Sequence, residues 1–230
     1  TLWQEGWLTR GEVQPPRHVA ATRVHFPAIR AYRDPRLRQA WQRFRAARST
    51  RQQGFRHFCE TERLWLDDFA LFMALKETHG GQAWPSWERE LVERDDRALA
   101  KAAEASAERI RALSFFQFLF FEQWARVRDS AHARGIRILG DVPIFVSHDS
   151  ADVWSHPELF HLAADGSAAK VAGVPPDYYS ATGQLWGNPL YRWDVLARSG
   201  YAWWIDRFRA TLRTVDLVRL DHFRGFEAYW

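Results

Sequence analysis

An arginine and an acid stand two residues apart at the end of an apolar run late in the sequence. The run holds Leu217, Val218 and Leu220, whose branched side chains predict a short buried strand. Arg219 and Asp221 would then point to the same side of that strand. Charged groups are costly to bury unless they pair or do chemistry, and the arginine would keep the carboxylate ionised, as a nucleophile requires. Spacing alone favours the simpler interpretation, a structural ion pair that caps the strand.

The composition is typical of a folded chain with a large apolar core. Of the 230 residues, 47% are apolar and 15% aromatic, so disorder is not expected. The thirteen tryptophans fit either core packing or flat surfaces on which sugars or bases stack. Cys59 is the only cysteine, which excludes an internal disulfide and indicates a reducing compartment, so we expect a cytoplasmic protein. No run approaches the ~20 apolar residues of a membrane span, and we expect no membrane partner.

The charge is unevenly distributed along the chain. The formal net charge is +4, from 32 basic and 28 acidic residues, and residues 17–56 hold eleven arginines and one acid, Asp34. Such a stretch is a candidate surface for nucleic acid, but no basic and aromatic residues interleave there in a known motif. We favour its interpretation as the solvated face of a helix and expect no nucleic-acid partner.

Apolar spacing predicts a mainly helical first half. Residues 1–34 contain several prolines and no sustained period, so we expect loop and short strand there. Helical spacing follows over residues 35–48, 55–78, 96–108 and 110–133. Gly80-Gly81 ends the second of these helices and Gly135 ends the last, since glycine often follows a helix. The second and last helices are dense in apolar residues, which predicts that both are largely buried.

A helix followed by a strand that ends in an acid occurs twice. Residues 136–142 predict a strand that carries Asp141, directly after the helix that Gly135 ends. A helix over residues 201–212 leads into the strand that ends at Asp221. Two such units predict an α/β fold with a parallel sheet or a (β/α) barrel, in which active sites gather at the C-terminal ends of strands. A full barrel needs ~250 residues or more, so we expect at most a few of its strands.

The segment between the two units, residues 143–191, has the composition of a long loop, which in a compact domain is usually functional. Aromatic, amide and carboxylate side chains follow one another there. They are Asp177, Tyr178, Tyr179, Gln184, Trp186 and Asn188. This set suits a polyhydroxylated ligand, because rings stack on the C–H face of a sugar while polar groups bond its hydroxyls. An Ω-loop packed by its own aromatic residues explains the composition equally well.

Several common sites have no counterpart in the sequence. We find no glycine-rich phosphate loop, no dinucleotide-binding fingerprint and no paired-cysteine zinc motif. The serines do not form a nucleophile-elbow pattern. His148, His156 and His161 lie near acids, but their spacing fits no helical metal motif. We therefore expect neither a metal nor a cofactor.

Several stretches resemble the 4-α-glucanotransferase family, the amylomaltases or disproportionating enzymes of the α-amylase clan. The resemblance is most specific over residues 135–230, moderate over residues 65–87 and weak before residue 55. The stretches are GDVPIFV (140–146), DSADVW (149–154), VAGVPPDYYS (171–180), GQLWGNPLY (183–191) and VDLVRLDHFRGF (215–226), with WLDDFALF (65–72) as a further one.

The resemblance implies an α/β fold, a partial (β/α)8 TIM barrel with largely helical inserted subdomains. Residues 1–134 would form the mainly helical region with part of the barrel framework. Residues 135–230 would form part of the catalytic barrel, including the glucan-binding loop at residues 143–191. The implied activity is the transfer of α-1,4-glucan segments between maltooligosaccharides by a retaining double displacement, which uses two carboxyl groups.

The same resemblance implies roles for individual residues. Asp221 matches the catalytic nucleophile, and Arg219 matches the arginine that holds it. Asp141 and His222 match residues that bond the glucose unit next to the cleaved bond. The remaining implied glucan contacts lie in the loop that closes over the substrate, at Asp177, Tyr178, Gln184 and Trp186.

The family's acid/base glutamate and its second aspartate come from later strands, so we expect them beyond Trp230. We therefore expect a segment of a longer enzyme, one that is inactive and not stably folded alone, because a barrel without several strands leaves open sheet edges. The alternative is a non-catalytic relative that binds glucan. The sequence makes no prediction of oligomeric state.

Overall fold

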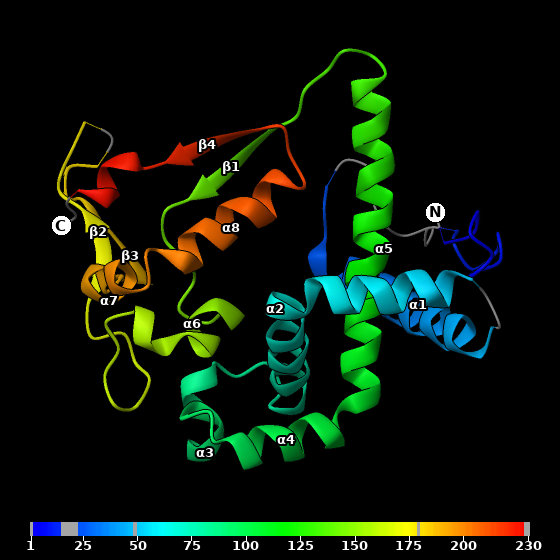
Figure 1. Ribbon diagram of the computed structural model, residues 1–230, viewed down its shortest axis with the longest axis horizontal. Helices are drawn as coiled ribbons and strands as arrows, with labels where there is room; N and C mark the ends of the chain where they lie inside the picture. The colour runs from blue at the N-terminus through cyan, green and yellow to red at the C-terminus, as the bar shows by residue number, and fades with distance from the viewer. Residues whose placement is uncertain (1, 15–22, 48–49, 179, 228–230) are drawn as a thin grey trace.

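The computed structural model describes residues 2–14, 23–47, 50–178 and 180–227, and it combines long helices with short strands. Figure 1 shows α1 toward one end of the long axis and strands β2 and β3 toward the other. In chain order, the elements are α1 (Phe26–Ala46), α2 (Arg51–Thr78), η1 (Trp84–Ser86), α3 (Arg89–Val92), α4 (Asp96–Ala105), α5 (Ala107–His132), β1 (Leu139–Pro143), α6 (Ala151–Ser155), η2 (Pro157–Leu159), β2 (Val171–Val174), β3 (Gln184–Pro189), α7 (Trp193–Arg198), α8 (Ala202–Leu212), β4 (Leu217–Asp221) and η3 (Phe223–Phe226).

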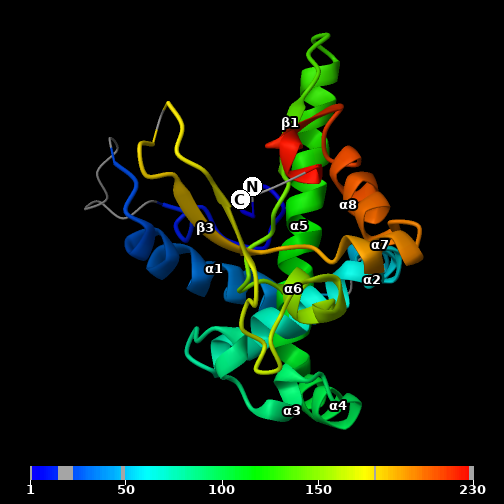
Figure 2. The same cartoon turned by 90° about the vertical axis from the view of Figure 1, so that its left-hand side faces the viewer.

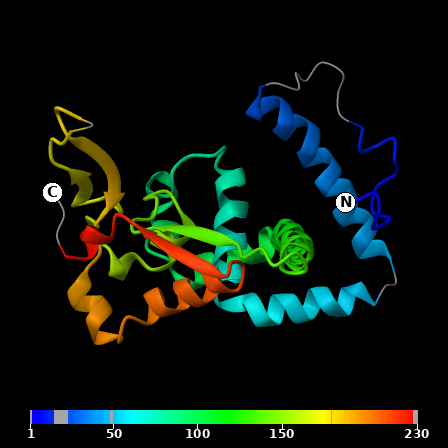
Figure 3. The same ribbon diagram turned by 90° about the horizontal axis from the view of Figure 1, so that it is seen from above.

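Helices α1, α2 and α5 share an aromatic core. Phe44 of α1 stacks on Phe115 of α5 with ring centroids 4.4 Å apart, and Phe55 of α2 meets Phe44 edge-on at 5.6 Å. Such pairs add to the free energy gained by burying the rings. Figure 3 looks along α5 and shows it between α1 and the strands. No helix in the described ranges is both long and apolar enough to cross a membrane.

Most predicted helices are confirmed, but the first one begins earlier than predicted. Helix α1 begins at Phe26, so the prediction of loop and strand is wrong for residues 26–34, while residues 15–22 lie outside the described ranges. Proline is tolerated in the first helical turn, where Pro27 lies, and His25 caps that turn by accepting a hydrogen bond from the Ala28 N–H at 3.2 Å. Pro35 lies inside the helix rather than at its start.

The arginine-rich stretch makes ion pairs within the chain. Arg43 donates two hydrogen bonds of 2.7 Å to the Glu12 carboxylate, and Arg45 pairs with Glu108 at 2.7 Å. The bond from Arg43 lowers the pKa of Glu12 to about 2. The parts of this stretch at residues 17–22 and 48–49 lie outside the described residues. In the described part, the helical position of these arginines fits the predicted solvated face.

Strands β1 and β4 pair in parallel, as the repeated helix–strand units predict. Helix α5 precedes β1 and α8 precedes β4, and Figure 1 shows α8 running beside the pair. The prediction that β4 is buried is wrong for the described chain, because Leu217 is 39% exposed and its partner Leu139 is 63% exposed. Burial of a strand depends on what covers the sheet, and no other strand in the described residues extends this two-stranded sheet.

Asp216 fixes the start of the parallel pair. Its Oδ2 accepts a hydrogen bond of 2.8 Å from the Ile138 N–H, and its own N–H donates to the Ile138 carbonyl at 2.9 Å. Both carboxylate oxygens also lie 2.9 Å from His132 Nε2. The bond from Ile138, followed by that from His132, lowers the pKa of the Asp216 carboxyl. This residue therefore joins the end of α5 to both strands.

Residues 143–191 contain more regular structure than their composition predicts. They include α6, η2 and the antiparallel pair of β2 and β3. Gly183 lies in the connection of the two strands with φ +73°, and a Cβ there would meet the Val174 carbonyl oxygen at 2.5 Å. Only glycine satisfies both constraints at that turn. Tyr191, which follows β3, is fully buried and donates a hydrogen bond of 2.8 Å to the Ile144 carbonyl.

A buried carboxylate joins α2 to the end of α8. Glu62 is 6% exposed and accepts two hydrogen bonds from the Arg213 guanidinium, at 2.7 and 2.6 Å. The Trp65 indole N–H donates to the same carboxylate at 2.6 Å. These contacts hold the segment that leads into β4 against the helical region.

Replacing Arg213 with methionine should lower the free energy of unfolding by about 2 kcal/mol, because the buried Glu62 carboxylate loses its cationic partner. The loss should be smaller than for a fully buried pair, since the Arg213 side chain is 46% exposed. Urea unfolding of the whole protein that contains this sequence measures it. Arg198→Met is the control, because its pair with Asp194 is exposed on both sides and should contribute less than about 0.5 kcal/mol. Equal losses of unfolding free energy for the two substitutions would contradict the stabilising role of the Glu62–Arg213 pair.

Candidate active site at the ends of the parallel strands

The register of β1 and β4 brings two acids and an arginine to the same end of the sheet. Asp141 lies opposite Arg219, and Pro143 lies opposite Asp221. Arg219 donates two hydrogen bonds to the Asp141 carboxylate, from Nε at 2.9 Å and from Nη2 at 2.6 Å. The same Nη2 lies 3.7 Å from Asp221 Oδ1. The guanidinium therefore lies between the two carboxylates.

The principal partner of Arg219 differs from the one that the sequence suggests. Spacing and resemblance both assign Arg219 to Asp221, whereas its two hydrogen bonds go across the sheet to Asp141. These bonds lower the pKa of the Asp141 carboxyl, with the hydrogen bond from Arg219 as the largest cause. Asp141 is thereby held as a carboxylate. The Asp221 oxygens make longer contacts, with Arg219 at 3.7 Å and with His222 at 3.4 Å, on a side chain that is 40% exposed.

His222 follows Asp221 and turns the chain out of the strand. Its backbone is left-handed, with φ +52°, which ends β4 and begins the short turn η3. The His222 Nε2 lies 3.4 Å from Asp221 Oδ2, and its ring lies against that of Trp186 with centroids 4.5 Å apart. The residue therefore joins the acid at the strand end to the β2–β3 pair.

One face of β3 completes the site. Gln184, Trp186 and Asn188 follow one another at a spacing of two, which places them on the same face of a strand. The Trp186 indole N–H donates to Gln184 Oε1 at 3.0 Å. The Asn188 Nδ2 donates to the Val146 carbonyl at 2.8 Å, which joins β3 to the segment that follows β1. The Trp186 ring also meets Phe145 edge-on, with centroids 6.2 Å apart.

The end of β1, the face of β3 and the end of β4 form an open cavity of about 200 Å³. Its lining residues are Pro143, Ile144, Phe145, Trp186, Asn188, Asp221 and His222. Aromatic rings, an amide, an imidazole and one carboxylate therefore meet at one cavity. Such a lining can hold a ring with a C–H face and several hydroxyls, with the carboxylate positioned to act on it.

The structure brings together only part of the residues that the sequence singles out. Asp221, His222 and Trp186 line the cavity, and Arg219 and Gln184 contact these lining residues. Asp141 is one step further away, because its hydrogen bonds go to Arg219. Asp177 and Tyr178 lie in the connection of β2 and β3, which projects from the body of the molecule in Figure 2, and they do not line the cavity. The Asp177 Oδ1 accepts a hydrogen bond from the Ser180 N–H at 2.8 Å, and the Tyr178 side chain is fully exposed.

Sequence reasoning missed the cavity residues that follow β1, whereas Asn188 belongs to the set of loop side chains that the sequence singles out as suited to a sugar. The alternation of polar and aromatic residues from Gln184 to Asn188 is a strand signal that could have identified the shared face. Nothing in the sequence pattern indicates that Ile144 and Phe145 face the same cavity as Asp221.

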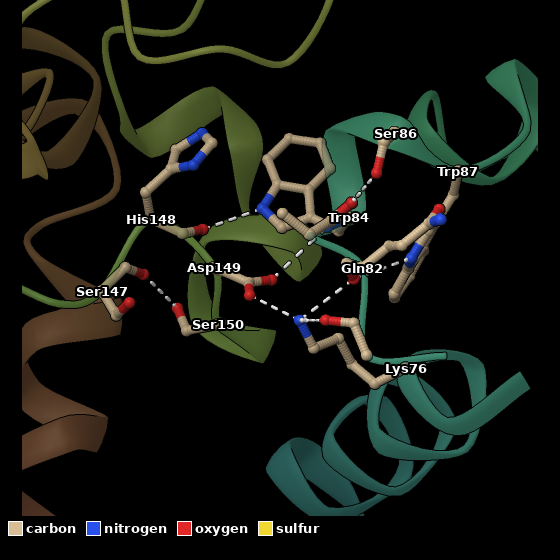
Figure 4. Close-up of polar contacts among 11 residues, drawn as sticks. Lys76, Gln82, Trp84, Ser86, Trp87, Ser147, His148, Asp149 and Ser150 are labelled. Carbon is tan, nitrogen blue, oxygen red and sulfur yellow. Dashed lines mark hydrogen bonds and ion pairs between the residues drawn. The ribbon is translucent and has the colours of Figure 1, made fainter. Parts of the chain in front are cut away.

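A second polar cluster holds the segment that follows β1, and it is separate from the cavity (Figure 4). Lys76, near the end of α2, donates to Asp149 Oδ2 at 2.5 Å and to the carbonyls of Gly81 and Gln82 at 3.1 Å each. The Trp84 indole N–H donates to the His148 carbonyl at 2.8 Å. All these donors are used within the cluster, so it anchors the chain rather than offering free reactive groups.

The described residues contain no cluster of three or more histidine, cysteine or acidic side chains that could hold a metal ion.

Comparisons with known proteins identify relatives along the whole chain. A sequence model described as 4-alpha-glucanotransferase matches residues 1–230. The 4-alpha-glucanotransferase of Thermus thermophilus is 52% identical over 209 residues, which are 90% of this chain and 42% of that protein. The 4-alpha-glucanotransferase of Synechocystis sp. is 46% identical over 231 residues, which cover 100% of this chain and 46% of that protein.

A solved structure agrees with these sequence relatives. The amylomaltase from Streptococcus agalactiae, in complex with acarbose, matches with a TM-score of 0.94 and 36% sequence identity. The match covers 100% of this chain and 46% of that chain, so this chain spans less than half the length of each of these relatives. Since the match of the family model extends over all 230 residues, the chain belongs to the 4-alpha-glucanotransferase family.

Proposed function

We propose that the whole protein containing this sequence transfers α-1,4-glucan segments between maltooligosaccharides, with Asp221 as the nucleophile. The observation that carries the proposal is the position of the Asp221 carboxylate on the wall of a cavity formed with Trp186, Phe145 and His222. Family membership and relatives named 4-alpha-glucanotransferase support the reaction type. The related amylomaltase in complex with acarbose supports a site for a glucan-like ligand.

In the proposed reaction, an Asp221 oxygen attacks the anomeric carbon of a bound glucan as the glycosidic oxygen leaves with a proton. The 4-hydroxyl of an acceptor glucan then attacks the glycosyl ester and gives its proton to the acid/base group, which frees the Asp221 carboxylate and restores the α configuration. The acid/base group must be a second carboxyl at about 5–5.5 Å from the first. Asp221 is the only carboxyl among the described residues that line the cavity, so none of the other lining residues can be the acid/base group. The acid/base glutamate beyond Trp230, and the inactivity of this segment alone, stay predictions.

Asp141 and His222 are proposed to bond hydroxyls of the glucose unit next to the cleaved bond. Asp141 suits this role because its two hydrogen bonds from Arg219 keep it ionised, and an ionised carboxylate accepts strong hydrogen bonds. Trp186 is proposed to stack on a sugar ring. Gln184, Asp177 and Tyr178 are proposed to contact glucan when the connection of β2 and β3 closes over it, which would also limit attack by water.

The parallel pair is proposed to form part of a (β/α)8 barrel. Residues 135–230 would supply part of the catalytic barrel and residues 1–134 the mainly helical region with part of the barrel framework. The helices that precede β1 and β4 and the carboxylates at the C-terminal ends of these strands support this arrangement. The cytoplasmic location stays a prediction.

Asp221→Asn in the whole protein should lower transfer from maltotriose by at least about a thousandfold, because the amide cannot form the covalent intermediate. Chromatography of the products measures this, since the active protein should convert maltotriose into glucose and longer oligosaccharides. Asp206→Asn on the exposed face of α8 is the control and should leave the rate unchanged.

Three outcomes of this experiment are informative. Undiminished turnover by Asp221→Asn would refute the assignment of the nucleophile. If the unaltered protein produces neither glucose nor oligosaccharides longer than maltotriose, the proposed transfer is wrong. Binding of maltooligosaccharides without any product would instead support the alternative, a non-catalytic glucan-binding relative.

Trp186→Ala should weaken maltotriose binding about tenfold, because a stacked aromatic face contributes on the order of 1.4 kcal/mol. Titration calorimetry on the Asp221→Asn background measures binding without turnover. Trp3→Ala is the matched control, since Trp3 is also partly exposed but lies in the N-terminal segment away from the cavity. Equal affinities of the Trp186→Ala and Trp3→Ala proteins would remove Trp186 from the binding site.

Arg219→Gln should raise the pKa of Asp141 back toward its ordinary value of 3.8, because the two hydrogen bonds that stabilise the carboxylate are lost. A carbon-13 NMR titration of the aspartate carboxyl groups measures the shift. Asp165 is the internal control, since its lowered pKa comes from hydrogen bonds of Ser167 and should not change. An unchanged Asp141 titration would show that Arg219 does not control its charge.

A further inference from the structure

Arg207 directs its guanidinium onto the backbone at the end of β1. The Nη2 donates to the Pro143 carbonyl at 2.8 Å, and the Nη1 lies 3.3 Å from the Ile144 carbonyl and 3.4 Å from the Tyr191 hydroxyl. The Tyr191 hydroxyl in turn donates to the Ile144 carbonyl at 2.8 Å. Two side chains from different elements therefore hold two consecutive carbonyls.

This arginine differs from most others that pair in the chain. Among the residues that the structure describes, no carboxylate oxygen lies within 4.0 Å of its guanidinium nitrogens. Its guanidinium carbon lies 4.9 Å from the Trp204 ring centroid and 5.5 Å from that of Trp203, which orients the planar group. The two rings orient the guanidinium, and its hydrogen bonds to described residues go to the carbonyls at the end of β1 and to the Tyr191 hydroxyl.

The carbonyls that it holds are part of the candidate active site. Pro143 is the last residue of β1 and lies opposite Asp221 in the parallel pair, and both Pro143 and Ile144 line the cavity. Proline has no N–H, so the backbone at this position donates no hydrogen bond of its own to the sheet. The end of β1 therefore depends on the hydrogen bonds that its carbonyls accept, and Arg207 and Tyr191 donate them.

We infer that Arg207 is a positioning residue. By binding the carbonyls of Pro143 and Ile144, it fixes the part of the cavity wall that β1 contributes, beside Asp221 in the parallel pair. It acts through the backbone and does not touch the substrate. It also links the two strands, because α8, which carries Arg207, leads directly into β4. The consequence for the reaction rests on the proposed function. The effect on the backbone does not.

The experiment compares Arg207→Met with Arg207→Lys and Arg209→Met in the whole protein. Methionine keeps the apolar stem over the tryptophan rings but removes the hydrogen bonds to both carbonyls and to the Tyr191 hydroxyl. Lysine retains a cation that reaches one carbonyl without the paired geometry of the guanidinium. Arg209 lies two residues further along α8, is 74% exposed and pairs only with Asp206 among the described residues, so it controls for loss of charge on this helix.

Arg207→Met should lower kcat for maltotriose transfer by about tenfold or more while KM changes by less than about threefold, since misplaced groups cost rate more than ground-state binding. Arg207→Lys should recover part of the loss, and Arg209→Met should match the unaltered protein. The inference would be overturned if kcat of Arg207→Met fell only in proportion to the fraction of folded protein. A kcat within about twofold of the unaltered value would also overturn it.

Hydrogen exchange gives a readout that does not depend on activity. The amides of residues 141–147, apart from Pro143, should exchange faster in Arg207→Met than in Arg209→Met, with no difference in α5. If the unaltered protein shows no glucan transfer, the proposed function fails, but this exchange difference still tests the positioning role. Equal exchange of residues 141–147 in the two variants would refute it.

Discussion

The register between β1 and β4 is the constraint on which the candidate site depends. Side chains alternate between the two faces of a strand, so a slip of one residue would move Arg219 and Asp221 to the opposite face from Asp141. The structure fixes this register at both ends. Asp216 bonds the backbone of Ile138 where the strands begin, and the side chains of α8 and of the chain after β3 bond the carbonyls where β1 ends.

A single guanidinium between two carboxylates gives those carboxylates different properties. Asp141 receives both strong hydrogen bonds and is exposed at the sheet end, while Asp221 receives a longer contact and faces the cavity. Hydrogen bonds reduce the electron density that a carboxylate can offer an electrophile, so Asp221 keeps more of it than Asp141. The asymmetry therefore agrees with the proposed roles, in which Asp141 binds and Asp221 reacts.

Sequence reasoning succeeded where interactions are local. The dense apolar spacing of α2 and α5 and the glycines that follow them predicted both helices, because these signals lie within a few residues of one another. It failed for α1, since the effect of Pro27 depends on its place in the first turn. The partner of Arg219 could not be predicted, because Asp141 is distant in sequence and comes near only through the sheet register. The contribution of Phe145 to the cavity is missed for the same reason.

The left-handed backbone of His222 has a consequence for how this site can vary. A residue at φ +52° is readily accommodated when it is glycine, asparagine, aspartate or histidine, whereas β-branched side chains pay a large steric penalty there. Main-chain geometry therefore limits the range of substitutions beside Asp221, independently of the contacts that the side chain makes. In a directed-evolution library at this position, many variants would be lost because they fold poorly. Histidine is the one residue of the permitted set that also supplies an imidazole to the cavity.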